Sequence, residues 1–273
     1  MKQMKSLIKR EFLEYKGSFT TVPLLLSSFI LFVFIFLTPN FNGVPWNAKI
    51  YSELNLSENL ESFYLSLFYI FSFPFFFVLF FTQLNYFSHT LFSDRKDRSV
   101  LFWFSMPVSE LKAIIAKYIL GLLLMPIVYG FYSLMTVGFL LLYFYFKIPV
   151  EGISIFDLFI YIKSCFSLFF SYFYMSFWLF PVFAWALFCS AYAKKSPFIM
   201  AFLFPLLVIF FELLLKGGNS YLLNFISLVS KNMFQGNFRV AQFSDALVAC
   251  GVGSFLTGSS LYLRRRCFRF DFS

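Results

Sequence analysis

The sequence predicts an all-α polytopic membrane protein, as its composition, its apolar runs and its lack of strand-like alternation indicate. Of its 273 residues, 60% are hydrophobic and 13% are charged, and 47 are Phe. An ordinary soluble domain carries roughly a quarter charged residues and could not bury this much apolar surface. Apolar runs of about 17–25 residues recur, which is the length an α-helix needs to cross a bilayer. The alternation typical of membrane β-barrel strands is absent.

The chain opens with an amphipathic segment. Residues 2–16 place Met4, Leu7, Ile8, Phe12 and Tyr15 on one helical face and mostly charged residues elsewhere. This pattern predicts a helix that lies in the membrane interface and contacts membrane lipid. We therefore assign 1–20 to an interfacial helix and 21–273 to a single transmembrane domain.

The apolar runs predict six spans, at about 21–38, 63–88, 114–146, 161–193, 197–215 and 245–263. The first run is not followed by a small-residue cleavage pattern, so we expect an uncleaved span rather than a signal peptide. Ser109 stands where it can cap the third helix. Tyr221–Val229 is mostly apolar but covers only about half a membrane, which predicts a re-entrant segment before the last span. Prolines predict kinks in the second to fifth spans, at Pro74, Pro126, Pro181 and Pro205.

The distribution of basic residues predicts the orientation. The formal net charge is +9, but the basic residues lie in the segments between and beyond the spans, which argues against nucleic acid as a partner. With the N-terminus inside, sixteen of the 22 Lys and Arg fall on the cytoplasmic side and the remaining six fall outside. The positive-inside rule therefore predicts both termini in the cytoplasm.

The residues of most enzyme sites are missing. His89 is the only histidine, so neither a His-Glu-x-x-His zinc pair nor a histidine-rich metal site can be built. No Gly-rich phosphate loop occurs, so the chain has no nucleotide site of this kind. The spacing of the cysteines fits neither a zinc site nor a disulfide framework: Cys165, Cys189, Cys250 and Cys267. We predict no catalytic, cofactor-binding or metal-binding residue.

Glu212 is the one acidic residue that falls inside a predicted span. A carboxylate in lipid costs a few kcal/mol or more, which makes Glu212 a candidate intramembrane polar site. Lys216, four residues later, can shield it in an i,i+4 pair. A structural ion pair and a functional site both remain open.

The residues from Asp94 to Ser109 interrupt the apolar sequence, and we call them the charged segment. Five of the six positions from Asp94 to Ser99 are charged, and the five apolar residues that follow, Val100 to Phe104, are too few to span a bilayer. If the segment is helical, Asp94 and Arg98 can pair one turn apart. An interfacial helix with an aromatic belt is one interpretation. The other is a docking helix for a soluble partner, because Trp and Arg commonly anchor such contacts.

The charged segment, with the sequence Asp-Arg-Lys-Asp-Arg-Ser-Val-Leu-Phe-Trp-Phe-Ser-Met-Pro-Val-Ser, resembles the first cytoplasmic loop of bacterial type-2 ABC transporter permeases. The likeness covers about sixteen residues in motif and the whole chain in layout. It implies a coupling helix that contacts a separate ATPase subunit, which binds the ATP, and a second permease subunit, identical or different. It also implies the cytoplasmic (inner) membrane of a bacterium. The implied coupling positions are Asp94, Arg95, Asp97, Arg98, Leu101, Phe102, Trp103 and Pro107.

Two other classes of function remain open. An intramembrane transferase or peptidase would work without ATP and would depend on His89 or Glu212. A non-transporting accessory protein would bind partners without a nucleotide-linked conformational change. The expectation that we carry forward is the permease subunit of an ABC exporter, with an unspecified substrate.

Overall fold

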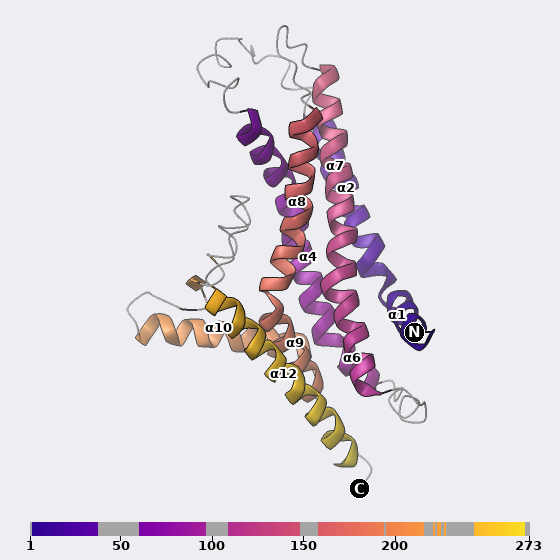
Figure 1. Ribbon diagram of the computed structural model, residues 1–273, viewed down its shortest axis with the longest axis vertical. Coiled ribbons are helices and arrows are strands. Elements are labelled where there is room, and N and C mark those ends of the chain that lie inside the picture. The colour runs from indigo at the N-terminus through magenta and orange to yellow at the C-terminus, as the bar shows by residue number, and fades with distance from the viewer. Residues whose placement is uncertain are drawn as a thin grey trace. The chain divides into compact units, whose positions relative to one another are not determined.

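The computed structural model (Figure 1) describes residues 2–37, 60–96, 109–147, 158–193, 195–215, 221, 223–224, 227 and 243–270. The regular elements in these ranges are all helical, and no described residue lies in a β-strand. The predicted all-α fold class is therefore confirmed for this part of the chain.

Nine α-helices and two π-helical turns contain most of the described residues. The π-helical turns are η1 (Gly17–Thr21) and η3 (Ile119–Leu124). The first α-helix, α1, confirms the helix expected at the start of the chain. The α-helices are α1 (Lys2–Glu14), α2 (Val22–Leu37), α4 (Leu60–Lys96), α6 (Glu110–Tyr118), α7 (Met125–Lys147), α8 (Leu158–Trp178), α9 (Phe180–Tyr192), α10 (Pro197–Leu215) and α12 (Phe243–Phe270).

Four stretches of described helix are long and apolar enough to cross a membrane: Gly17–Phe36, Phe68–Lys96, Glu110–Tyr143 and Pro197–Leu215. They correspond to the first, second, third and fifth predicted spans. The predicted fourth span is divided into α8 and α9, which meet at a bend of 50° and would count as a fifth span if they cross together. The bend lies at Leu179, two residues before Pro181, so a break near this proline is confirmed. The described residues thus contain four to five candidate spans, as in a multi-pass helical membrane protein.

The predicted sixth span, 245–263, is helical within α12. However, α12 is less apolar than the other long helices and is not among the candidate spans. Most of the predicted re-entrant segment lies outside the described residues, and the described Tyr221, Leu223, Asn224 and Ser227 are helical and exposed. Six spans and a re-entrant segment therefore stay predictions.

Each π-helical turn is followed closely by a proline. Pro23 follows η1 by two residues, and Pro126 follows η3 by two residues. A proline ring inside an α-helix clashes with the carbonyl four residues earlier and provides no N–H group. The wider π turn accommodates the proline without ending the helix, so these spans stay continuous.

The described residues form two compact units. The first comprises Met1–Lys16, Leu79–Pro126 and Phe173–Ser273, and the second comprises Gly17–Val78 and Ile127–Tyr172. In the second unit, hydroxyl groups connect α4 to α8 and to α7, since Tyr69 Oη lies 2.9 Å from Ser171 Oγ. Ser72 Oγ lies 2.9 Å from Ser133 Oγ. Such interhelical hydrogen bonds are favourable where no water competes.

In the first unit, a buried glutamine compensates for the π turn η3. The Met125 N–H donates to the Leu120 carbonyl, and Pro126 has no N–H, so the Gly121 carbonyl loses its helical donors. Gln83 Nε2 donates to this carbonyl at 2.8 Å and to Ser176 Oγ at 2.9 Å. Gln83 therefore joins α4, η3 and α8 through one side chain.

We expect Gly121→Ala to be less stable than Gly251→Ala by about 1–3 kcal/mol, the usual cost of overpacking. A Cβ at Gly121 would overlap the fully buried Phe87 ring, whereas a Cβ at Gly251 meets nothing within 4 Å. Both variants replace a glycine in helical backbone, in η3 and in α12, so their difference mainly reports the overlap. Thermal unfolding in detergent measures it, and equal melting temperatures would contradict this packing.

Candidate functional site

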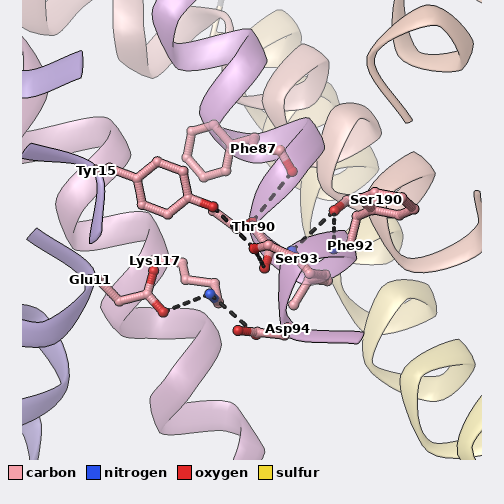
Figure 2. Close-up of polar contacts among 10 residues, drawn as sticks. Glu11, Tyr15, Phe87, Thr90, Phe92, Ser93, Asp94, Lys117 and Ser190 are labelled. Atoms are coloured by element: carbon pink, nitrogen blue, oxygen red, sulfur yellow. Dashed lines mark hydrogen bonds and ion pairs between the residues drawn. The ribbon is translucent and has the colours of Figure 1, made fainter. Parts of the chain in front are cut away.

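The first unit contains a cluster of charged and hydroxyl side chains where the charged segment begins. These side chains come from α1, from the C-terminal end of α4, from α6 and from α9, and Figure 2 shows most of them. We call this cluster the polar junction. Its residues are Glu11, Tyr15, Ser93, Asp94, Arg95, Lys117 and Ser190.

Lys117 lies at the centre of the charged part. Its Nζ is 2.6 Å from Glu11 Oε1 and 3.4 Å from Asp94 Oδ2. All three residues are buried, with exposed fractions of 2% for Lys117 and 5% for both Glu11 and Asp94. One ammonium group thus holds two carboxylates from separate helices, as Figure 2 shows. Removing one partner of such a buried set leaves a charge without compensation, which is strongly destabilising.

Tyr15 makes a second connection between α1 and α4. Its hydroxyl lies 3.2 Å from Ser93 Oγ, and its ring meets the edge of Tyr86 at 4.9 Å between centroids. Burial raises the pKa of the Tyr15 phenol to about 12. The phenol therefore stays protonated at physiological pH and keeps a proton to donate to Ser93.

Glu14 stands at the end of α1, close to the same charges. Burial, followed by the Glu11 carboxylate, raises the pKa of Glu14 above its ordinary value. Lys117 acts in the opposite direction and lowers it. The exposed Glu14 thus stands near Glu11 and Asp94, the two carboxylates that share Lys117.

Arg95 and Ser190 connect α4 to the end of α9, because the side chain of each residue bonds to the backbone of the other helix or of the residue that follows it. Ser190 Oγ accepts hydrogen bonds from the backbone N–H groups of Leu91 at 3.1 Å and Phe92 at 2.9 Å. Arg95 Nη2 donates to the carbonyls of Ser190 at 2.6 Å and Ala193 at 2.8 Å. The last carbonyls of a helix lack intrahelical donors, and a cation there also opposes the negative end of the helix dipole.

The structure describes only part of the charged segment. Asp94 and Arg95 are the first two predicted coupling residues, and both belong to the polar junction. At the other end, Ser109 has the extended backbone of an N-cap before α6, but its side chain makes no capping hydrogen bond. The remaining coupling residues lie outside the described part of the chain: Asp97, Arg98, Leu101, Phe102, Trp103 and Pro107.

The structure adds to the interpretation of the acidic residues. Asp94, which could pair with Arg98 if the charged segment is helical, pairs with Lys117 of α6, and Arg98 lies outside the described residues. Glu212 was taken as the one acidic residue inside a span, yet the candidate span Phe68–Lys96 includes the buried Asp94. Sequence reasoning missed this because the predicted span ended at residue 88, while α4 continues to Lys96.

Glu11 and Lys117 are site residues that sequence reasoning did not single out. Glu11 stands four residues after Leu7, on the apolar face predicted for residues 2–16, and both side chains are buried. A carboxylate on an apolar helix face is the signal that points to a buried partner. Lys117 was counted only as a cytoplasmic positive charge.

The two candidate enzyme residues, His89 and Glu212, lie elsewhere. His89 is half-buried on α4, with its ring 6.3 Å from that of Phe92. Glu212 Oε2 on α10 accepts the Tyr221 N–H at 3.0 Å, and Lys216 lies outside the described residues. Within the described residues, no group of three His, Cys, Asp or Glu side chains could hold a metal ion.

The comparisons with known proteins add no relative. No protein-family model, no curated protein and no solved structure matches this chain. The features that bear on function are therefore the residues of the charged segment and the polar junction that holds its first two residues.

Proposed function

We propose that this chain is the membrane subunit of an ATP-driven ABC exporter in the cytoplasmic membrane of a bacterium. ATP is bound and hydrolysed by a separate ATPase subunit, and this chain contributes the path for the substrate. The charged segment is the coupling element that the ATPase contacts.

The observation that carries this proposal is the attachment of Asp94 and Arg95. These two residues begin the charged segment and contact α6 and α9, with Glu11 of α1 joined through Lys117. A segment that transmits force needs a stiff connection to the helices it moves. A loop attached only through its backbone would absorb the displacement. The polar junction connects the side chains of Asp94 and Arg95, the first two residues of the charged segment, to neighbouring helices.

The remaining features of the proposal follow the sequence. Six spans would place both termini and the charged segment in the cytoplasm, and the residues around Tyr221–Val229 would form a re-entrant segment on the outer side. A second permease subunit would complete the path. Only Pro197 and Ala201 of α10 are buried, so most of this helix is left for lipid or for such a partner.

We expect Trp103→Ala and Arg98→Glu to weaken association with the ATPase subunit at least tenfold, since Trp and Arg anchors commonly contribute about 2 kcal/mol or more. The full chain is purified from its native membrane through a tag, and co-purified ATPase is quantified by mass spectrometry and by ATP hydrolysis. Trp46→Ala and Lys49→Glu, in the predicted outer loop, are the matched controls.

The two sets of variants distinguish the classes of function. A permease subunit loses its ATPase only with the changes in the charged segment. Equal association of all four variants would argue against a coupling role for this segment. If an ATPase binds but ATP causes no conformational change, the accessory protein is favoured. Activity without ATP that depends on His89 or Glu212 would favour the enzyme.

A further inference from the structure

Helix α1 carries Lys5 and Lys9 on the face opposite its buried one, and Lys16 follows two residues after the helix ends. Leu7 and Glu11 are buried, with exposed fractions of 6% and 5%, whereas Lys5, Lys9 and Lys16 are exposed. With 3.6 residues per turn, Lys5 and Lys9 fall within about 40° of one another around the helix axis and about 160° from the buried direction. We call these three lysines the lysine stripe.

The acidic residues of α1 do not lie on this stripe. Glu11 is turned inward and paired with Lys117 at 2.6 Å. Glu14 falls close to Glu11 around the helix, and the Glu11 carboxylate contributes to its raised pKa. The outward face of α1 therefore carries lysines and neither of the acidic residues of the helix. Leu13, which is 58% exposed, borders the stripe and adds an apolar side chain to this face.

The stripe ends directly before a candidate span. Lys16 is followed directly by Gly17, the first residue of the candidate span Gly17–Phe36, which contains no charged residue. The headgroup layer is about 5–8 Å thick on each side of the bilayer core. A lysine can lay its aliphatic stem along an apolar boundary and extend its ammonium group into this layer. Lys9 precedes Lys16 by about 10 Å along a helix, so a helix that lies in the plane of the interface, as predicted for residues 2–16, brings all three lysines to this layer.

We propose that the lysine stripe binds the headgroups of anionic phospholipids. The charge complementarity selects an anionic surface, and the exposed leucine beside the stripe selects a lipid surface over a purely polar partner. This inference depends on the membrane location of the chain and not on its proposed transport function. It holds or fails whether or not an ATPase associates.

The test uses the full chain, purified in detergent and delipidated, with phosphatidylglycerol or phosphatidylcholine added. Native mass spectrometry measures the apparent dissociation constant of each lipid. We expect Lys5→Gln/Lys9→Gln to weaken phosphatidylglycerol binding about 10- to 30-fold. Phosphatidylcholine binding should be unchanged, because its headgroup carries no net charge.

Two control variants make the outcome specific. Lys5→Arg/Lys9→Arg keeps the charge and should bind phosphatidylglycerol like the native chain. Lys163→Gln/Lys195→Gln removes two exposed lysines elsewhere and should also leave binding intact. Unchanged phosphatidylglycerol binding in Lys5→Gln/Lys9→Gln would overturn the proposal, as would an equal loss in the Lys163→Gln/Lys195→Gln control. If Lys5→Gln/Lys9→Gln binds phosphatidylglycerol like the native chain but no longer binds a soluble protein that the native chain binds, the proposal is also overturned. The lysine stripe would then be a protein-docking face.

Discussion

Lys117→Met is expected to lower the free energy of unfolding by about 3–5 kcal/mol, because it leaves two buried carboxylates without their cation. The distances of 2.6 Å to Glu11 and 3.4 Å to Asp94 make Lys117 the common partner of both. Thermal or denaturant unfolding of the purified chain in detergent measures the loss.

Lys112→Met is the matched control, since Lys112 is exposed on the same helix. The triple variant Lys117→Met/Glu11→Gln/Asp94→Asn removes all three charges and should recover much of the lost stability, because neutral amides cost far less to bury than carboxylates. Equal stability of Lys117→Met and Lys112→Met would contradict the buried ion pairs.

Arg95→Gln is expected to destabilise the chain by about 2–3 kcal/mol, the usual contribution of hydrogen bonds from a charged group. Its guanidinium group donates to the carbonyls of Ser190 and Ala193, at 2.6 and 2.8 Å. The shorter, neutral Gln side chain cannot reach both carbonyls. In the proposed transporter, Arg95→Gln should also reduce transport per ATP hydrolysed while the ATPase stays bound.

Lys96→Gln is the control for this prediction, because Lys96 is the next residue and is exposed. It should match the native chain in stability and in transport per ATP. If Arg95→Gln is as stable as the native chain, the hydrogen bonds from Arg95 to α9 do not contribute to stability, and the prediction is contradicted. If it is destabilised yet transports with native efficiency, Arg95 has a structural role only.

Much of the architecture could be predicted from the sequence because hydrocarbon solvent imposes simple rules. Apolar runs of sufficient length must be helical in a bilayer, and this places α2, α4, α7 and α10 without knowledge of any tertiary contact. The helix boundaries were less predictable. α4 extends to Lys96, eight residues beyond the predicted end, because its last polar residues are satisfied by α6 and α9.

The contents of the polar junction depend on tertiary contacts that a single sequence does not contain. Glu11 could have been suspected from its position four residues after Leu7, on an apolar face. That Lys117 would be its partner depends on α1 packing against α6, across more than a hundred residues. Gln83 is a similar case, since its acceptor at Gly121 becomes available only because η3 precedes Pro126.

Site-specific photo-crosslinking from position 103 in native membranes tests the central claim most directly, with a photoreactive phenylalanine analogue in place of Trp103. The account predicts cross-links to a soluble ATP-hydrolysing subunit on the cytoplasmic side, and no such cross-links from position 46 in the predicted outer loop. Cross-links to lipid alone, or to proteins on the outer side of the membrane, would contradict it.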